Sequence, residues 1–568
     1  MKKLLTPLKY QIPQIILIFL FLLVQSYCDL TLPQYTANIV DIGIQNTDFK
    51  YIINVGMIML IMVAISAFAT VGVSYFSSRV SSSYAKNLRQ KVYEKVLKFS
   101  NNELNNISRS SLITRTTNDV NQLQNVLGMI FTTLLFAPIL GIGSIIKAFE
   151  LGTDLSWIIF VTFIAVVLLL LIVIVRVLPY FKIIQEIIDK INKTSREILI
   201  GIPVIKAFVR QDYEEKKFQK VNREFYEINL SVFRNMFLMI PLMSLILNLM
   251  IVLILYFGAY DALSGSLLTG EIIAFIQYST QIVSSFLMIG GFMVMLPRIL
   301  VSGRRINEVL NTKLTIVDGD INEIKGTPTI EFKNVSYKYP NSEKETLKDI
   351  NFTLEKGKTT AIIGGTGSGK STILNLIPRL QDPSSGKILL NGIDLKKINL
   401  KFLRSKISFT PQNAILFQGT VKSNLKIGKS NATDEEINNA LNNAQVDFIN
   451  TLDDDVSQGG SNFSGGQKQR LSIARAIIGQ HDFYLFDDCF SALDMNTEHE
   501  IKNNLKKLNK SSILIVSQRI STIMDADEII VLNNGEIIDK GTHSYLVENC
   551  NIYKEIVNTQ IDTMEVSL

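Results

Sequence analysis

The chain has 568 residues, of which 47% are hydrophobic and 19% are charged, and its formal net charge is +6 at pH 7. This length and apolar content argue against a single water-soluble globule and favour a membrane protein that carries a soluble part. The small net charge disfavours a nucleic-acid-binding protein. Cysteines and histidines number three each and are widely spaced, so neither a disulfide framework nor a metal-ligand pattern is indicated.

Six uncharged, mainly apolar windows fill the first half of the chain, and each can supply the roughly 20 residues that a membrane-crossing helix needs. The Lys-rich start and the first window have the outline of a signal peptide. However, this window is long, lacks a small-residue cleavage pattern and is followed by more spans, so we interpret it as the first span. No window carries a charge in its central part. They lie between Lys9 and Asp29, Lys50 and Arg79, Asp119 and Lys147, Asp154 and Arg176, Arg234 and Asp261, and Glu271 and Arg298.

The loops between the windows differ in charge. Loops 79–119 and 176–234 are long and rich in Lys and Arg, whereas the other connections are short and nearly free of both. By the positive-inside rule, the long loops and both chain ends are predicted to be cytoplasmic. Heptad-like patterns over 83–100 and 179–227 predict that the second to fifth spans continue as helices well into the cytoplasm.

The sequence pattern changes after the sixth window. The stretch 311–327 is polar, and a strand-like alternation of apolar and polar residues begins at 329–335. We therefore predict an α-helical transmembrane domain with six spans over 1–310, a linker over 311–327 and an α/β domain over 328–568.

A glycine-rich loop stands between a buried strand predicted over 360–363 and a helix predicted over 371–380. In that setting the loop's backbone N–H groups can surround phosphates. Lys370 then supplies a cation to the β and γ phosphates, and the Ser371 hydroxyl can bind Mg²⁺. The predicted phosphate cradle is Gly364, Gly365, Thr366, Gly367, Ser368, Gly369, Lys370, Ser371 and Thr372.

Two further segments follow in the same domain. At 463–467 the chain reads Phe-Ser-Gly-Gly-Gln, and a helix that begins there presents a hydroxyl, backbone N–H groups and a helix dipole to a phosphate. Further on, an apolar strand over 483–486 ends in Asp487 and Asp488. A carboxylate at such a strand end can hold Mg²⁺ through water, which gives Asp487 a metal-binding role.

These three elements in this order resemble the ATPase domain of an ATP-binding cassette (ABC) protein. With six spans ahead of it, nearly the whole chain resembles an exporter-type ABC half-transporter: an α-helical transmembrane domain followed by an α/β P-loop ABC ATPase domain. The resemblance implies ATP and Mg²⁺ as cofactors. Segments 110–120 and 201–208 resemble those that bear the exporter's coupling helices, and Ser491-Ala492-Leu493-Asp494 the loop that crosses the dimer interface.

The resemblance also assigns roles to individual side chains. Tyr339 matches the aromatic residue that stacks on adenine, with Tyr337 as the alternative, an ordinary strand tyrosine. Gln412 matches the glutamine that touches Mg²⁺ and the attacking water. In this family the phosphate that meets the signature segment belongs to the opposite subunit, and its partners here are Ser464, Gly465, Gly466 and Gln467.

Two positions depart from the family pattern. Asp488 stands where the hydrolytic site carries Glu, and Gln518 stands where the switch loop carries His. The Asp side chain is shorter by about 1.5 Å, and a misplacement near 1 Å can cost roughly a hundredfold in rate. Gln can donate a hydrogen bond but cannot become a cation. We predict slow hydrolysis in this chain's own site; the alternative is that both changes are tolerated variations in an active site.

This asymmetry predicts a heterodimer, in which a second homologous half-transporter carries Glu and His. The expected function is ATP-driven export of amphipathic or hydrophobic small molecules, multidrug-like, across a cell membrane. The abundance of Lys, Asn and Ile favours a bacterial source. The alternatives are a lipid or peptide exporter, an importer with the exporter fold, and an ATP-gated channel or regulator. The candidate cargo surface on the last two spans comprises Met236, Met239, Met243, Gln277, Tyr278, Gln281, Ser284, Met288 and Met293.

Overall fold

The computed structural model describes residues 4, 6–151, 155–265, 267–340, 342–507 and 511–565. It divides into two compact units. The helical unit comprises 1–97 and 110–312, and the α/β unit comprises 98–109 and 313–568.

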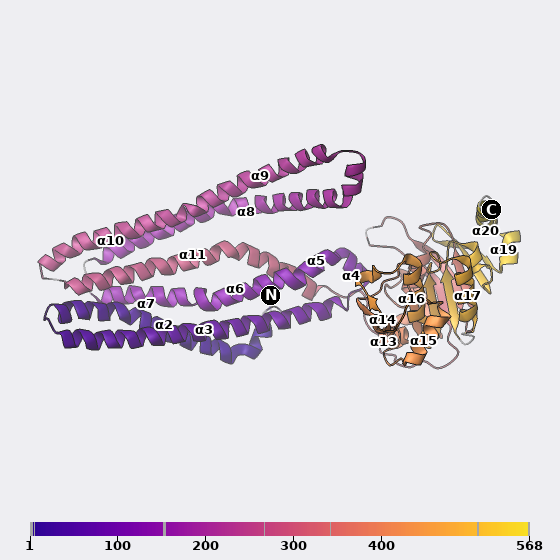
Figure 1. Cartoon of the computed structure of the whole chain (residues 1–568), viewed down its shortest axis with the longest axis horizontal. Helices are drawn as coiled ribbons and strands as arrows, with labels where there is room; N and C mark the ends of the chain where they lie inside the picture. The colour runs from indigo at the N-terminus through magenta and orange to yellow at the C-terminus, as the bar shows by residue number, and fades with distance from the viewer. Residues whose placement is uncertain are drawn as a thin grey trace. The chain divides into compact units, whose positions relative to one another are not determined.

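Long helices make up the helical unit (Figure 1). Within its described part, five helices are long and apolar enough to cross a membrane, and Ser156–Ile172 is a shorter apolar helix. Apolar side chains lie exposed along these helices, as expected where lipid is the solvent. The elements are η1 (Thr6–Gln11), α2 (Ile12–Asn38), η2 (Ile39–Ile44), α3 (Phe49–Val96), α5 (Arg109–Thr114), η3 (Arg115–Asp119), α6 (Val120–Met129), η4 (Ile130–Leu134), α7 (Phe136–Glu150), α8 (Ser156–Ala207), α9 (Gln211–Phe237), α10 (Met239–Leu263) and α11 (Thr269–Asn311).

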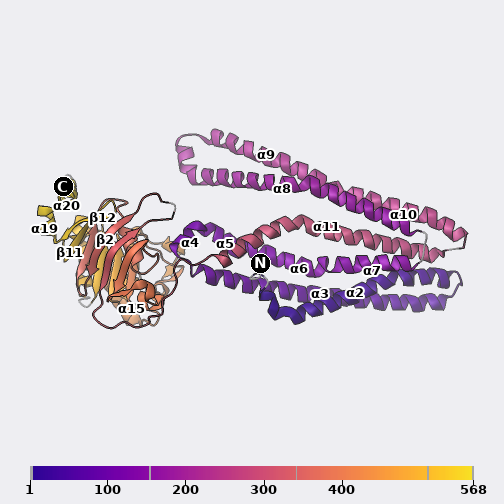
Figure 2. The ribbon, with the colours of Figure 1, turned by 180° about the vertical axis from the view of Figure 1, so that it is seen from behind.

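Two helix pairs are visible in both views of the helical unit. Figures 1 and 2 show α2 beside α3, and α8 beside α9 as an antiparallel pair. Segment 201–208 ends α8, and the turn that follows has Val209 at φ +51°. Segment 110–120 runs through α5 and η3 into α6, and α5, η3 and α6 form one continuous helical stretch. η2, η3 and η4 are π-helical, which is rare and holds one extra residue per turn.

The first apolar helix is longer than its sequence window. We placed the end of that window at Asp29, and this limit is wrong, because α2 continues through Asp29 to Asn38 and η2 extends the helix to Ile44. A carboxylate therefore lies inside the first span, contrary to the expectation that no span carries a central charge. Its Oδ1 accepts a hydrogen bond from the Ser66 hydroxyl at 2.8 Å, which gives the carboxylate one polar partner.

Part of the candidate cargo surface is occupied by packing. Met243 is 2% exposed, and Tyr278 is 1% exposed. The Tyr278 hydroxyl donates to the backbone carbonyl of Leu30 at 2.9 Å. Met243 and Tyr278 are therefore packed inside the helical unit. The side chains of Met236 and Met293 lie outside the described residues.

The α/β unit contains a six-stranded sheet in the order β12-β11-β3-β10-β9-β6 and a four-stranded antiparallel sheet in the order β2-β1-β4-β5. In the larger sheet β12 is antiparallel to β11, and the other neighbours are parallel. The strands are β1 (Ile330–Tyr337), β2 (Leu347–Leu354), β3 (Thr359–Ile363), β4 (Ser385–Leu390), β5 (Ile393–Asp394), β6 (Ile407–Thr410), β7 (Gly419–Thr420), β8 (Asp455–Val456), β9 (Phe483–Asp487), β10 (Ser512–Val516), β11 (Glu528–Asn533) and β12 (Glu536–Gly541).

The helices of the α/β unit are mostly short. The helix that follows the glycine-rich loop ends at Leu376, four residues before the predicted end at Leu380, because Pro378 follows and cannot donate a backbone hydrogen bond. The helices are α4 (Asn101–Asn106), α12 (Lys370–Leu376), η5 (Leu395–Lys397), α13 (Leu400–Ser405), α14 (Val421–Leu425), α15 (Asp434–Asn443), η6 (Gln458–Gly460), α16 (Gly465–Ile477), α17 (Met495–Lys506), α18 (Ile520–Ile523), α19 (His543–Asn549) and α20 (Asn551–Glu565).

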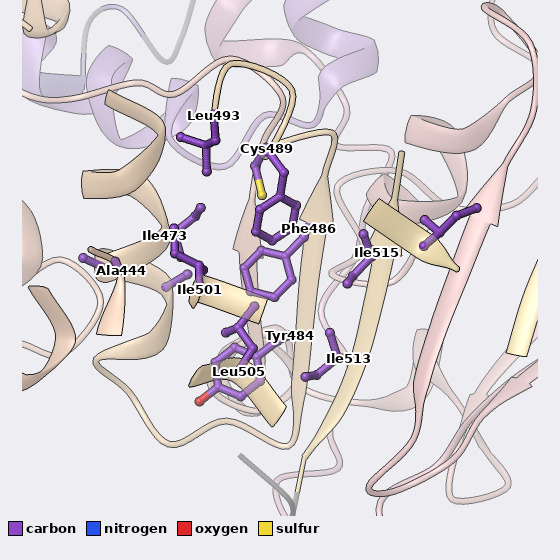
Figure 3. Packing of buried hydrophobic residues seen from close by; sticks show 14 of the residues in the cluster. Ala444, Ile473, Tyr484, Phe486, Cys489, Leu493, Ile501, Leu505, Ile513 and Ile515 are labelled. Atoms are coloured by element: carbon purple, nitrogen blue, oxygen red, sulfur yellow. The ribbon is translucent and has the colours of Figure 1, made fainter. Parts of the chain in front are cut away.

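Both faces of the larger sheet are buried. Tyr484 and Phe486 of β9 face a cluster that includes Ile473 of α16 and Ile501 of α17 (Figure 3). The alternate residues of β9, Phe483 and Leu485, belong to the second cluster, which includes residues of the smaller sheet and of α12. Central parallel strands covered on both faces read as continuous apolar runs, which explains the sequence of β9.

A buried carboxylate joins α4 to the stretch after α11. Glu103 is 3% exposed and accepts hydrogen bonds from the backbone N–H groups of Ser100 at 2.6 Å and Thr315 at 2.7 Å. Burial tends to raise the pKa of Glu103, but hydrogen bonds from Ser100 and Thr315 outweigh it and hold that pKa below the ordinary value. The ionised form is therefore the one that the fold stabilises.

We predict that Glu103→Ala frees the stretch around Thr315. Hydrogen bonds to a charged group contribute about 1.5–3 kcal/mol, so amide exchange at Thr315 should accelerate at least tenfold at pH 7. Because the folded pKa of Glu103 is depressed, the stabilisation is present above its unfolded pKa and is lost as pH falls through the folded pKa. Hydrogen–deuterium exchange of the full chain measures this effect. The exposed Glu323→Ala on the same stretch is the control, and equal protection in both variants would contradict the prediction.

Candidate nucleotide site

Four parallel strands end at the same level in the α/β unit. Val516 at the end of β10 is in register with Asp487 of β9 and with Ile362 of β3. Thr410 at the end of β6 is in register with Phe486 of β9. The loops that follow these strands therefore meet at one edge, which is where open α/β sheets bind ligands.

These loops enclose a cavity of about 360 Å³. It unites residues from the glycine-rich loop with residues that follow β6, β9 and β10, so side chains more than a hundred residues apart in the sequence face one space. The lining residues are Tyr339, Thr346, Thr366, Gly367, Gly369, Lys370, Ser371, Thr372, Gln412, Asp487, Asp488, Val516 and Gln518.

The glycine-rich loop is shaped by its backbone. Gly369 has φ +104°, and a Cβ there would lie 2.9 Å from the carbonyl oxygen of Thr346, so only glycine fits. The Lys370 ammonium donates to the carbonyl oxygens of Gly364 and Gly365, each at 2.8 Å. Burial lowers the pKa of Lys370, and Asp488 and Asp487 work against that shift. The loop thus holds a buried cation at the start of α12, where N–H groups also point outward.

Asp487 and Ser371 form a pair suited to a cation. The Ser371 hydroxyl donates to Oδ1 of Asp487 at 2.9 Å, and Asp487 is 6% exposed. Burial raises the pKa of Asp487, only partly offset by this hydrogen bond. No cluster of three His, Cys, Asp or Glu side chains is found among the described residues. The pair fits Mg²⁺, which typically takes one or two carboxylates together with phosphate oxygens and waters.

Asp488 adopts a left-handed backbone with φ +46°, and its N–H donates to the carbonyl of Val516 at 2.8 Å. Asp tolerates this region better than most residues, and such strain gathers at functional sites. Its Oδ2 accepts a long hydrogen bond of 3.4 Å from the Gln412 amide. Burial raises the pKa of Asp488 despite this contact, so burial disfavours the charged forms of both adjacent carboxylates, Asp487 and Asp488.

Gln518 is an exposed side chain at the mouth of the cavity. The backbone carbonyl oxygen of Gln518 accepts a hydrogen bond of 2.7 Å from the side-chain amide of Gln560 in α20, which fixes the backbone at Gln518. Asp488 and Gln518 therefore face the same space from neighbouring strands. The sequence gives each of them separately, and only the register of β9 with β10 brings them together.

The structure separates the two tyrosines. Tyr337 is 2% exposed and its hydroxyl donates to Gln381, whereas Tyr339 lines the cavity. The Tyr339 hydroxyl lies 3.1 Å from that of Thr372, and its ring meets the Tyr337 ring edge-on at 4.9 Å. Tyr337 is therefore a packing residue, and Tyr339 is the tyrosine available to a ligand.

The segment 463–467 lies at the start of α16 and not in this cavity. Ser464 is the N-cap: its hydroxyl accepts from the Gln467 N–H at 3.3 Å, and the Gln467 side chain accepts from the Ser464 N–H at 2.9 Å. Such a capping box fixes the first turn of a helix. Ser464 and Gly465 are exposed, so this helix start is open to a ligand bound elsewhere than the chain's own cavity.

Comparison with known protein sequences shows the family to which the two units belong. Residues 15–286 match the family described as ABC transporter transmembrane region, and residues 347–491 match the family described as ABC transporter. The chain is 37% identical over 548 residues to an uncharacterized ABC transporter ATP-binding protein of Mycobacterium tuberculosis, which covers 95% of this chain and 94% of that protein. It is also 37% identical over 552 residues to the uncharacterized ABC transporter ATP-binding protein YfiB of Bacillus subtilis, covering 95% of each. The chain belongs to the ABC transporter family.

A solved structure agrees with this assignment. The chain resembles a bacterial Atm1-family ABC exporter with ATP bound, with a TM-score of 0.82, covering 96% of this chain and 98% of that one. The sequence identity is 23%, so this likeness shows the fold. The predicted fold class, a helical transmembrane region followed by an α/β ABC ATPase domain, is confirmed.

The ABC transporter chain is thus a multi-pass membrane protein whose ATPase domain binds ATP. One transmembrane region and one ATPase domain make a half-transporter, which requires a second such unit as its partner. Sequence reasoning missed Thr346 and Val516 as lining residues. Val516 precedes Gln518 and could have been found from that spacing. Thr346 reaches the cavity only because the start of β2 passes the glycine-rich loop, and no sequence pattern announces such an approach.

We predict that Asp487→Asn stabilises the nucleotide-free ABC transporter at pH 7. Because burial raises the folded pKa of Asp487, its contribution to stability is fully present below the unfolded pKa and is lost as pH rises through the folded pKa. Asn keeps an acceptor for Ser371 and removes the buried charge. The thermal midpoint of the full chain should rise by about 2–4 °C per kcal/mol gained, and the gain should shrink towards pH 4.

Differential scanning fluorimetry over a pH series measures this difference. The exposed Asp453→Asn is the matched control. A midpoint that falls at pH 7, or a gain that does not depend on pH, would show that the Asp487 carboxylate is not held against ionisation.

Proposed function

We propose that this chain is one half of a heterodimeric ATP-driven exporter and that its own nucleotide site hydrolyses ATP slowly. The observation that carries the proposal is that Asp488 and Gln518 face the same cavity as Lys370 and Ser371. Both departures from the family pattern thus fall where the attacking water has to be positioned.

The two side chains weaken the same step. Asp488 has a backbone fixed by its bond to Val516, so the short side chain cannot advance into the cavity by a backbone shift. An error of about 1 Å in such a position can cost roughly a hundredfold in rate. Gln518 supplies a neutral amide and no cation. Gln518 does not compensate for the short carboxylate of Asp488, and Asp488 does not supply the cation that Gln518 lacks.

The remaining residues suit nucleotide binding. Lys370 and the backbone of 364–372 would hold the phosphates, and Tyr339 would stack on the base. Ser371, Asp487 and Gln412 would hold Mg²⁺, which would neutralise charge on the phosphates. A site built in this way retains ATP for long periods.

The start of α16 serves the second subunit in this proposal. Ser464, Gly465 and Gly466 complete a site on the partner, which carries Glu and His and turns ATP over. Because the two nucleotide sites differ in this proposal, the dimer is a heterodimer. It lies in a bacterial cell membrane with both ends of this chain in the cytoplasm. The transmembrane domain spans 1–310, the linker 311–327 and the ATPase domain 328–568.

We predict that the full chain reconstituted alone shows low ATP turnover, and that Asp488→Glu combined with Gln518→His raises it about 10–100-fold, because a longer carboxylate and a cationic donor reach the water. Phosphate release in proteoliposomes measures turnover. Lys370→Ala in the same background is the control, since it removes the phosphate contact and should abolish the gain.

The opposite result is equally clear. Strong, cooperative turnover by the unaltered chain that Asp488→Asn abolishes would show that Asp488 is a competent catalytic carboxylate. The asymmetric assignment would then be wrong, and a homodimer with two equal sites would replace it.

The cargo in this proposal is an amphipathic or hydrophobic small molecule. We predict that proteoliposomes containing the complex, purified through a tag on this chain, accumulate a fluorescent amphiphile against its gradient only with ATP. Ion conductance without accumulation would indicate a gated channel, and net movement in the opposite direction would indicate an importer. Mass spectrometry of the same preparation identifies the partner.

A further inference from the structure

A polar cluster joins four helices of the helical unit around Asp29. The Ser66 hydroxyl of α3 donates to the Asp29 carboxylate of α2 at 2.8 Å. The Gln281 amide of α11 donates to the backbone carbonyl of Asp29 at 3.0 Å, and the Ser144 hydroxyl of α7 donates to Oε1 of Gln281 at 2.7 Å. α2, α3, α7 and α11 lie alongside one another in Figures 1 and 2.

Asp29 and Ser66 lie well inside the apolar stretches of α2 and α3. At 1.5 Å per residue, Asp29 is about 18 Å along the helix from Asp41 and about 30 Å from Lys9. Ser66 is about 24 Å from Lys50 and about 20 Å from Arg79. The carboxylate is therefore an intramembrane acid, the kind of group that marks a ligand pathway in membrane proteins.

No positive charge balances it within the described part of the chain. None of the ion pairs there includes Asp29. On α7, one turn beyond Ser144, Lys147 is already paired with Glu150 at 2.6 Å. A carboxylate at this depth is unfavourable unless a cation or water compensates it. One serine hydroxyl supplies a hydrogen bond but no charge.

A polar track leads away from the cluster. On α3, Ser66, Thr70, Ser74, Ser78 and Ser82 recur every fourth residue, so each lies about one turn from the next in a row that winds slowly around the helix. Thr70, Ser74, Ser78 and Ser82 are exposed and line an open hollow of about 700 Å³, together with Val71, Tyr75 and Arg79. Ser66, one turn before Thr70, donates to the Asp29 carboxylate. Exposed hydroxyls thus run along α3 from Ser82 to Thr70, one turn from Ser66.

A second buried polar group lies close by. Ser26, one turn before Asp29 on α2, is 2% exposed, and its hydroxyl has no hydrogen-bond partner among the described residues. A buried hydroxyl left without a partner in the protein points to a partner from outside it. The cluster therefore has both an uncompensated charge and unused hydrogen-bonding capacity.

We propose that Asp29 binds the positive charge of a lipophilic cation that this transporter carries. The inference rests on the proposed export function and narrows its cargo from amphipathic compounds in general to monovalent organic cations. The carboxylate supplies the counter-ion, and the apolar walls of the helices accommodate the hydrophobic body. Ser66, Gln281 and Ser144 are positioning residues that hold Asp29 in place.

The test compares a cation with a neutral molecule of the same shape. Tetraphenylphosphonium and tetraphenylsilane are offered to the full chain with its partner in lipid nanodiscs, and equilibrium binding is measured without ATP. Asp29→Asn should weaken binding of the phosphonium at least tenfold and change that of the silane less than twofold. Ser66→Ala retains the carboxylate and should cost less than threefold for either compound.

A double variant guards against misfolding. Asp29→Ser with Ser66→Asp moves the carboxylate across the same hydrogen bond and should restore phosphonium binding to within threefold of the unaltered protein. If Asp29→Asn weakens both compounds equally, or weakens neither, the cluster only joins helices and the proposal is wrong. Failure of the double variant to restore binding also counts against it.

Transport separates this proposal from the one on which it rests. If the reconstituted complex moves neither compound but binds the phosphonium through Asp29, the export function fails and the cation site stands. If it moves a neutral amphiphile with ATP while Asp29→Asn leaves phosphonium binding and transport intact, export stands and the cation site fails.

Discussion

The nucleotide site depends on one constraint, the common level at which β3, β6, β9 and β10 end. Parallel pairing of these strands is held by backbone hydrogen bonds and by cores on both faces of the sheet. A shift of one residue in β9 would turn the Tyr484 face towards the other core and withdraw Asp487 from Ser371. The packing in Figure 3 is therefore what places the carboxylates.

Crowding at that edge has an electrostatic consequence. Burial lowers the pKa of Lys370 and raises those of Asp487 and Asp488, so all three charged forms are disfavoured at once. They persist because each lies near an opposite charge. Phosphates and a divalent cation bring charges that complement this set. The left-handed backbone of Asp488 lies at this same edge, and backbone strain of that kind gathers at binding sites.

Features formed by neighbouring residues could be predicted from the sequence, whereas features that depend on contacts between distant segments could not. The apolar spans, the glycine-rich loop and the strand before Asp487 are continuous patterns in the sequence. Of the six predicted spans, five correspond to described helices long and apolar enough to cross a membrane, and the fourth contains the shorter apolar helix Ser156–Ile172. The predicted end of the first span was wrong because a charge normally ends an apolar window. Here Asp29 lies inside α2, and the Ser66 hydroxyl of another helix donates to its carboxylate. The approach of Thr346 and the choice between Tyr337 and Tyr339 depend on contacts between distant segments. Such contacts leave no trace in a single sequence.

The π-helical segments η3 and η4 have a consequence for how this chain can change in length. η3 lies between α5 and α6, and η4 lies between α6 and α7. Each accommodates one residue more than an α-helix would, while the helix on either side keeps its own regular turn. Removal of a single residue there would convert the segment to α-helix and leave the flanking faces aligned with their neighbours. Elsewhere in α3 or α11, the same deletion would rotate everything beyond it by about 100°. Insertions and deletions that survive in the helical unit should therefore concentrate at η3 and η4.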